Sequence, residues 1–180
     1  MEVFIETERL IIRPILAGDD EAMFRMDSDP DVMKYIGRAP VTDIEETREI
    51  IRFVQQQYED HGIGRWAMAH KNTNEFIGWT GYKFMTNKVN GHTGFYDFGY
   101  RLQQAHWGKG YATEAAIASL QYGIEKLGYK DIYAMTDINN AASRRILEKI
   151  GFKLVEIFAY DDSSYKWREP GEPTTWYKYG

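Results

Sequence analysis

The stretch "HWGKGYATEA", which runs from His106 to Ala115, places two glycines and a lysine directly before a run of good helix formers. The start of a helix leaves four backbone N–H groups without intrahelical partners and has a partial positive charge. Because glycine lets a ligand approach the backbone closely, the stretch predicts a phosphate-binding loop. On this spacing alone, a tight strand-to-helix turn that binds nothing is an equal alternative.

Two familiar phosphate loops fit the stretch poorly. A Walker loop needs Ser or Thr after its lysine, and here Lys109 is followed by Gly110. The dinucleotide fingerprint needs a third glycine where Thr113 stands, although Asp131 could supply the acid expected about 20 residues further on. The groups left to hold a phosphate are the Lys109 ammonium, the Thr113 hydroxyl and the backbone amides of Gly108, Lys109, Gly110, Tyr111 and Ala112.

The segments around the loop have the patterns of strands and helices. Three strand-like runs precede it and begin at Arg65, Glu75 and Gly94. Turn-forming stretches separate these runs, so an antiparallel meander is expected. After the loop come a helix that Gly128 ends, a short buried strand at 131–136 and a second helix at 139–151. The stripe expected to face the core on the first of these helices consists of Ile117, Leu120, Ile124 and Leu127. This order predicts one parallel pair of strands, joined by a right-handed crossover, in an otherwise antiparallel sheet.

The two ends of the chain complete the expected fold. Residues 7–14 predict a first strand, and a short helix follows that ends before Pro30. Thr42 and Glu45 have the form of a capping box, which predicts the start of a longer amphipathic helix. Two or three further strands are expected in the tail. The prediction is therefore a mixed α/β fold, with about four helices around a mostly antiparallel sheet, in a single domain over residues 1–180.

The composition excludes several classes of site and partner. The 180 residues contain no cysteine, which rules out disulfides, thiolate metal sites and a cysteine nucleophile. A formal net charge of −5 with no long basic run argues against nucleic acid as the main partner. No apolar stretch reaches the roughly 20 residues of a membrane span, and the N-terminus lacks the apolar region of a signal peptide, so a cytoplasmic protein is expected. The histidines lack metal-ligand spacing, so no metal site is expected; they are His61, His70, His92 and His106.

Three pieces of the sequence together resemble the GCN5-related N-acetyltransferases: "TERLIIRP" from Thr7, "YRLQQAHWGKGYATEA" from Tyr100 and "NNAASRRILEKIGF" from Asn139. The resemblance spans residues 7–160 in the right order. Within the family it is to the branch that includes the ribosomal-protein N-terminal (RimJ- and RimL-type) acetyltransferases. It implies a sheet that splays between the strand ending at Leu102 and the next parallel strand, with acetyl-CoA entering the gap as co-substrate.

The resemblance also implies which residues hold acetyl-CoA. The family's phosphate loop, Arg/Gln-x-x-Gly-x-Gly/Ala, maps onto residues 107–112, with Trp107 in place of the usual Arg or Gln. The loop amides would then bind the pyrophosphate. The backbone of Tyr100, Arg101 and Leu102 would pair with the pantetheine arm.

Asn140 and Ser143 match the family's Asn-x-x-Ser at the start of the last predicted helix. The resemblance implies a cofactor contact for Asn140 and, for Ser143, a hydroxyl close to the sulfur that can protonate the departing thiolate. Helix capping is an equal alternative, because Asn at the N-cap and Ser at N3 satisfy unpaired amides. Many relatives place a general-acid tyrosine one helical turn beyond the serine, and this chain has Leu147 there.

Asp97 is the first candidate for a catalytic base, acting directly or through water. An acceptor ammonium must lose a proton before it can attack a thioester. Strand alternation puts Asp97 on one face with Phe95, Gly99 and Arg101, at a strand position where this branch has a glutamate. An acid that faces solvent or pairs with Arg101 is the more common outcome for a charged residue on a strand.

The acceptor and the assembly are left open by the sequence. The expected acceptor is a primary amine, either a protein N-terminus or a small molecule such as a polyamine or an antibiotic, and an inactive acyl-CoA-binding domain is the alternative in another class. The oligomeric state is open too, a homodimer included. A basic stripe is expected to be solvated, with a contact to the cofactor's 3′-phosphate as the alternative; it consists of Arg144, Arg145 and Lys149. The aromatic residues of the tail are expected to pack in the core or between subunits; they are Tyr165, Trp167, Trp176, Tyr177 and Tyr179.

Overall fold

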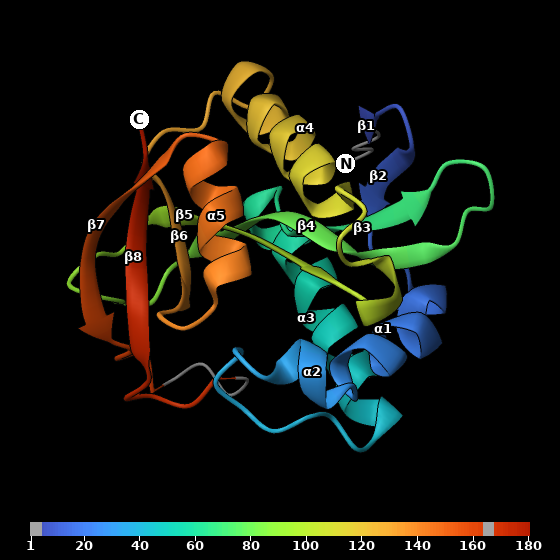
Figure 1. The fold of residues 1–180 in the computed structure, drawn as a ribbon, viewed down its shortest axis with the longest axis horizontal. Coiled ribbons are helices and arrows are strands. Elements are labelled where there is room, and N and C mark those ends of the chain that lie inside the picture. Colours follow the sequence, from blue (N-terminus) through green and yellow to red (C-terminus); the bar gives the residue numbers. More distant parts are fainter. Residues whose placement is uncertain (1–4, 164–167) are drawn as a thin grey trace.

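The computed structural model describes residues 5–163 and 168–180. Its eight strands form one sheet in the order β1-β2-β3-β4-β5-β6-β8-β7, and Figure 1 shows β1 and β7 at opposite edges. The strands are β1 (Ile5–Glu6), β2 (Leu10–Pro14), β3 (Arg65–His70), β4 (Phe76–Met85), β5 (Phe95–Leu102), β6 (Ile132–Asp137), β7 (Phe152–Ala159) and β8 (Pro173–Tyr179). The predicted meander is the antiparallel run of β3, β4 and β5.

Helices cover both faces of the sheet. Those of the described residues are α1 (Asp20–Asp27), α2 (Pro30–Met33), α3 (Ile44–His61), α4 (Tyr111–Glu125) and α5 (Ala141–Lys149). Met23 of α1 and Ile51 of α3 share one buried cluster, whereas Leu120 of α4 and Leu147 of α5 share another with Phe98 of the sheet. Figure 1 shows α1, α2 and α3 grouped together, apart from α4 and α5. The predicted mixed α/β fold is confirmed, with the short helix α2 added to the four expected.

β5 and β6 are the parallel pair that the order of strands and helices predicted. Their register joins Tyr96 to Ile132 and Asp97 to Tyr133. In the described part of the chain, no residue of β5 beyond Asp97 pairs with β6, whereas β4 pairs with β5 as far as Leu102. The second half of β5 therefore borders a gap in the sheet, which confirms the splay that the family resemblance implied.

Helix α4 packs on the sheet through small residues together with most of the predicted apolar stripe, since Leu120 is buried and Ile124 and Leu127 pack against the same cluster. Ile117 is 40% exposed. The small residues that α4 buries are Ala115, Ala116, Ser119 and Gly123. The hydroxyl of Tyr82 donates a hydrogen bond to the carbonyl of Leu120 (3.0 Å), and a Cβ at Gly123 would lie only 2.2 Å from that hydroxyl oxygen. The stripe prediction was wrong for Ile117, because close helix–sheet packing here requires small side chains.

Two helix starts refine the sequence predictions. Asp43 caps α3, since its carboxylate accepts a hydrogen bond from the amide of Glu45 (2.9 Å); the capping box of Thr42 was therefore wrong by one residue. The first helix ends at Asp27, before Pro30 as predicted, and Pro30 begins α2, because proline suits the first helical position. Across the described residues, no helix is both long and apolar enough to cross a membrane.

Candidate active site

A cavity of about 210 Å³ extends through the gap between β5 and β6. On the side of α1–α3 its wall includes Asp97 and Arg101. On the side of α5 it includes Tyr100, Asn140 and Ser143. The splayed strands therefore bring five of the residues predicted from the sequence to one cavity, although they come from β5 and from a helix 38 residues or more further along the chain.

Two buried ion pairs form the wall on the side of α1–α3. Arg65 of β3 donates to the carboxylate of Asp97, and Arg101 of β5 donates to that of Asp27 on α1 (2.8 Å). The Trp79 ring contacts both guanidinium groups, with its centre 5.0 Å from the guanidinium carbon of Arg65 and 5.1 Å from that of Arg101. Cation–π contacts of this kind stabilise desolvated arginines.

The predicted facing of β5 is confirmed, but the predicted alternatives for Asp97 are not. Asp97 is only 8% exposed, so it is not a surface acid, and its partner is Arg65 and not Arg101. Arg65 also donates to the backbone carbonyls of Gly81 (2.6 Å) and Asp97 (2.7 Å). The ion pair leaves the second carboxylate oxygen of Asp97 as the candidate proton acceptor in the cavity.

Asn140 and Ser143 occupy the first turn of α5. Asn140 is the N-cap, and its side-chain oxygen accepts from the amide of Ser143 (3.1 Å), so the capping alternative is confirmed. The phenol of Tyr100 donates to the carbonyl of Ser143 (2.9 Å) and lies 3.3 Å from its hydroxyl oxygen. Burial raises the pKa of Tyr100, so this phenol stays protonated at neutral pH. Tyr100 thus fixes the position of the serine at the edge of the gap.

The glycine loop ends at an uncapped helix start. Gly108 (φ 72°) and Gly110 (φ 82°) are both left-handed, and Gly110 is the N-cap of α4 without a side-chain cap. A Cβ at Gly108 would meet no atom within 4 Å, so the loop faces open space. The first-turn amides of α4 are therefore accessible to an external anion.

Neighbouring side chains hold this loop in place. Arg9 donates to the carbonyl of Lys109 (2.8 Å) and pairs with Glu114 (2.7 Å) in the first turn of α4. The indole of Trp107 donates to the carbonyl of Leu102 (3.0 Å), which ties the loop to the end of β5. Trp107, at the position of the Arg or Gln in the motif, therefore stabilises the loop.

Backbone groups along the gap are oriented for an extended ligand. The amide of Tyr96 donates toward β6, to the carbonyl of Asp131 (3.3 Å). Successive residues of a strand alternate their amides and carbonyls between its two sides, so those of Phe98 and Tyr100 also point toward the gap. The carbonyl of Leu102 accepts from Trp107. Of the predicted backbone set of Tyr100, Arg101 and Leu102, Tyr100 is thus the residue whose amide and carbonyl both face the gap without a partner in β6.

The predicted sites thus fall into two groups on the structure. Asp97, Tyr100, Arg101, Asn140 and Ser143 line the cavity, whereas the loop residues lie outside its lining, at the start of α4. In the described residues no cluster of His, Asp or Glu could hold a metal ion. The lining also contains cationic residues that the sequence analysis did not select: Arg38, Arg65, Lys83 and Arg168.

The basic stripe of α5 is partly anchored and partly exposed, and the described aromatic residues of the tail pack in the core. Arg144 is anchored by hydrogen bonds to the Tyr177 hydroxyl (3.3 Å) and to the carbonyl of Ile138 (3.1 Å), while Arg145 and Lys149 are exposed. Of the tail aromatics, Trp176 and Tyr177 are fully buried, which confirms core packing for them, and Tyr179 packs against the same core. Tyr165 and Trp167 lie outside the described residues.

Lys83 on the cavity wall is expected to make stability depend on pH. Burial lowers the pKa of Lys83 to about 8, although the Asp97 carboxylate opposes this shift. Because the folded-state pKa lies below the unfolded value, the unfolded chain binds more protons between about pH 8 and 10.5, so stability rises with pH there. The free-energy gain over that window is about 3 kcal/mol. At pH 7.5, Lys83→Met should be more stable than the original chain, because it has no buried ammonium. In urea unfolding at pH 7.5, 9 and 10, this difference in the free energy of unfolding should shrink as the pH rises.

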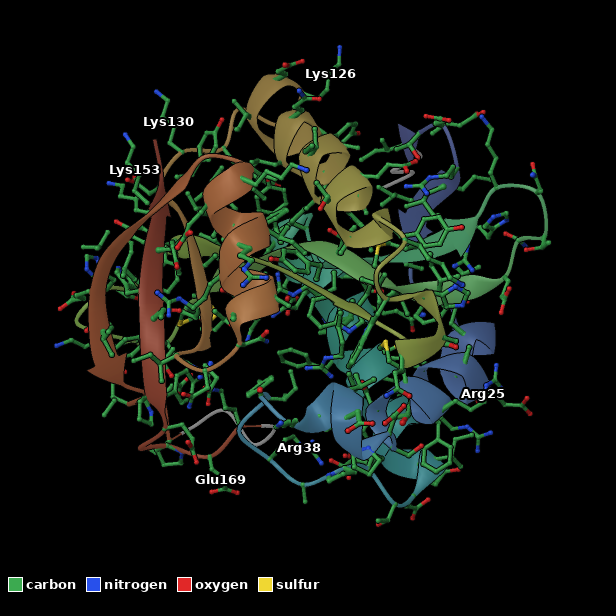
Figure 2. The ribbon with its side chains drawn as sticks, in the orientation of Figure 1. Arg25, Arg38, Lys126, Lys130, Lys153 and Glu169 are labelled. Atoms are coloured by element: carbon green, nitrogen blue, oxygen red, sulfur yellow. The ribbon has the colours of Figure 1, made fainter. Side chains whose placement is uncertain are left out.

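The matched control is Lys126→Met, because Lys126 is exposed at the end of α4, as Figure 2 shows. Its stability difference from the original chain should not change with pH over the same window. A constant difference for Lys83→Met would contradict the depressed pKa of that lysine.

Comparison with known proteins agrees with this geometry. The family model of the acetyltransferase (GNAT) domain matches residues 9–153. The chain is 31% identical over 147 residues to the N-acetyltransferase p20 of Bacillus licheniformis, which covers 82% of this chain and 80% of p20.

Solved structures share the fold. A GNAT-family acetyltransferase from Bacillus anthracis has a TM-score of 0.76 at 28% identity, covering 98% of this chain and 97% of that one. RimL, a ribosomal L7/L12 α-N-protein acetyltransferase solved with coenzyme A, has a TM-score of 0.76 and covers 98% and 97%; at 14% identity this is a likeness of fold alone. The family match and the identity to p20 together show that the chain belongs to the GNAT family of acetyltransferases.

Proposed function

We propose that this protein transfers an acetyl group from acetyl-CoA to a primary amine, within one catalytic domain that comprises the whole chain. The observation that carries the proposal is the gap after Asp97, where the cavity joins the end of β5 to the first turn of α5. Such a gap gives an extended thiol cofactor and an acceptor access to the same point from opposite faces of the sheet. Acetyl-CoA supplies the activated acetyl group there.

The proposed cofactor contacts follow from the accessible donors. The first-turn amides of α4, together with Gly108, Lys109 and the hydroxyl of Thr113, bind the pyrophosphate, since a helix start with glycines favours phosphate. The backbone of β5 at Tyr100 pairs with the pantetheine arm. Asn140, at the N-cap of α5, contacts the same arm. No bound metal is required for this chemistry.

The proposed reaction needs two proton transfers. Asp97, directly or through a water, accepts a proton from the acceptor ammonium. The neutral amine then attacks the thioester carbonyl carbon, so that a C–N bond forms and the C–S bond breaks. The hydroxyl of Ser143, held by Tyr100, lies at the edge of the gap and relays the second proton: it donates its own proton to the departing sulfur and regains one, through water, from the positively charged nitrogen of the acylated amine. Backbone N–H groups along β5 stabilise the developing negative charge on the carbonyl oxygen.

RimL and this chain share a fold, and RimL acts on a protein N-terminus, so a RimL-type reaction in the cytoplasm is one candidate within this proposal. The other candidates are a polyamine or antibiotic acetyltransferase and an inactive acyl-CoA-binding domain. Two measurements separate them. Calorimetry with acetyl-CoA tests binding, and release of free thiol with protein N-terminal peptides, aminoglycosides, polyamines and amino acids tests turnover. Absence of heat with acetyl-CoA would overturn the proposal, and binding without any thiol release would favour the inactive domain.

Ser143→Ala is expected to lower kcat by about tenfold and to leave acetyl-CoA affinity unchanged. The effect is modest because a thiolate with a pKa near 8.5 leaves well even without a proton donor. The matched control is Ser28→Ala, which removes a serine hydroxyl at the end of α1, where it donates to the carbonyl of Phe24 (2.7 Å). An unchanged kcat for Ser143→Ala would show that the serine hydroxyl is not the proton donor and that this residue has only a structural role in the first turn of α5.

A further inference from the structure

One arginine on the cavity wall has no carboxylate partner among the described residues. Arg168 donates to the hydroxyl of Thr174 (2.6 Å), and its guanidinium carbon lies 4.0 Å from the ring centre of Tyr160. Its Nε is buried and has no hydrogen-bond partner within residues 5–163 and 168–180. Burying a guanidinium without an opposite charge is costly, so such a group at a cavity marks a place where an anionic ligand binds.

The other arginines of the lining are neutralised within the protein. Arg65 pairs with Asp97, and Arg101 with Asp27. Arg38, at the same end of the cavity as Arg168, pairs with Glu46 (2.6 Å). The carboxylates of the lining, Asp27 and Asp97, each already have a guanidinium partner, so no carboxylate charge of the lining is left to neutralise Arg168. The charge left over at this cavity is positive.

The surroundings of Arg168 hold its guanidinium in a fixed position. The amide of Glu169 donates to the carbonyl of Gly37 (2.9 Å), which joins the segment of Arg168 to the loop after α2. Figure 2 shows Arg38 and Glu169 at the same end of the molecule. A Cβ at Gly37 would lie 3.1 Å from the Cγ of Arg168, so the glycine leaves room for the arginine stem. Thr174, which accepts from the guanidinium, is itself fully buried.

We propose that Arg168 binds a carboxylate of the acceptor, so that the acceptor is a small amino acid-like molecule with an amine and a carboxylate. The proposal rests on the proposed acetyl transfer and specifies its substrate class. The planar guanidinium suits a carboxylate, which accepts hydrogen bonds from the terminal N–H groups of such a side chain. The carboxylate fixed at Arg168 directs the amine end of the acceptor toward Asp97 and the gap. Polycations lack the group that Arg168 would bind, and they would add positive charge to a cavity that is already positive.

The test uses matched acceptors in a thiol-release assay. The acids are glycine, β-alanine and 4-aminobutyrate, each compared with its carboxamide, and 1,4-diaminobutane and an N-terminal peptide complete the panel. The carboxamide of an α-amino acid has the less basic amine and so attacks more readily at neutral pH. A preference for the acid therefore cannot come from the amine. For the best acid, kcat/KM should exceed that of its carboxamide, and that of the diamine, by at least about tenfold.

Substitutions at Arg168 test whether this residue causes the preference for the acid over its carboxamide. Arg168→Gln should lose about tenfold or more in kcat/KM on the acid, with acetyl-CoA affinity and kcat/KM on the carboxamide unchanged, and Arg168→Lys should keep part of the preference. Arg25→Gln is the control, since Arg25 is exposed on α1 and projects outward in Figure 2. If Arg168→Gln fails to fold, the acid-to-carboxamide ratio of the original chain and of Arg168→Lys decides the matter.

Three results would overturn the proposal: no preference for the acid over its carboxamide, an equal loss on both acceptors in Arg168→Gln, or turnover of the diamine or peptide with none of the acids acetylated. Failure of the acetyl transfer itself is distinguishable, because it would be seen as no heat with acetyl-CoA and no thiol release with any acceptor. Binding of acetyl-CoA without acetylation of any acid also counts against the assignment of Arg168.

Discussion

Gly108→Asp is expected to weaken acetyl-CoA binding by about a hundredfold. A Cβ at Gly108 meets nothing within 4 Å, and aspartate tolerates the left-handed φ of 72° better than most residues, so the variant should fold. The added carboxylate would lie beside the amides proposed to bind the pyrophosphate. Two like charges about 5 Å apart near a protein surface repel by about 3 kcal/mol, which is about a hundredfold in affinity. Isothermal titration with acetyl-CoA measures the effect.

The chain offers a closely matched control for this change. Gly128, beyond the C-terminal end of α4, has φ 68°, and a Cβ placed there would likewise meet no atom within 4 Å. Gly128→Asp therefore imposes the same backbone cost and the same charge, but far from the start of the helix. Equal affinities for the two variants would show that the glycine loop does not hold the pyrophosphate. Added salt should reduce the difference between them, because the repulsion is partly screened.

The arrangement around the gap was predictable because it follows from the order of elements along the chain. A strand, a loop, a helix and a second strand in succession require a parallel pair, and the structure joins Tyr96 to Ile132 accordingly. The helix starts were predictable to within a residue, since Asn140 and Asp43 have the residue types that cap helices. Choosing between Thr42 and Asp43 requires the backbone angles, because both side chains can cap.

The charged wall of the cavity was not predictable in the same way. Arg65 and Asp97 are 32 positions apart, and strand alternation alone places each on a face without saying what covers that face. Charged residues on strands are usually exposed, so the pattern favoured a surface acid. Arg168 follows a segment with no helical or strand pattern, and its burial depends on contacts with Tyr160 and Thr174. Such burial is a property of the tertiary fold and leaves no periodic signal in the sequence.

Breaking the Arg65–Asp97 ion pair is expected to destabilise the protein by about 3–5 kcal/mol, the largest effect on stability expected here. Asp97→Leu leaves a buried guanidinium without its carboxylate, and Arg65→Met leaves a buried carboxylate without its guanidinium. In the double variant neither charge is left, so its free energy of unfolding in urea should lie closer to that of the original chain than either single variant does.

The same set of variants separates the structural role of Asp97 from its proposed role as a base. If Asp97 only neutralises Arg65, the double variant should recover turnover together with stability. If Asp97 accepts the proton of the acceptor, turnover should stay low in the double variant even though the protein is folded and binds acetyl-CoA. We expect the second result, because Asp97 lines the cavity at the point where β5 and β6 separate, whereas the ion pair uses one of its two carboxylate oxygens. Recovery of turnover in the double variant would show that Asp97 is not the base and that the acceptor loses its proton to water.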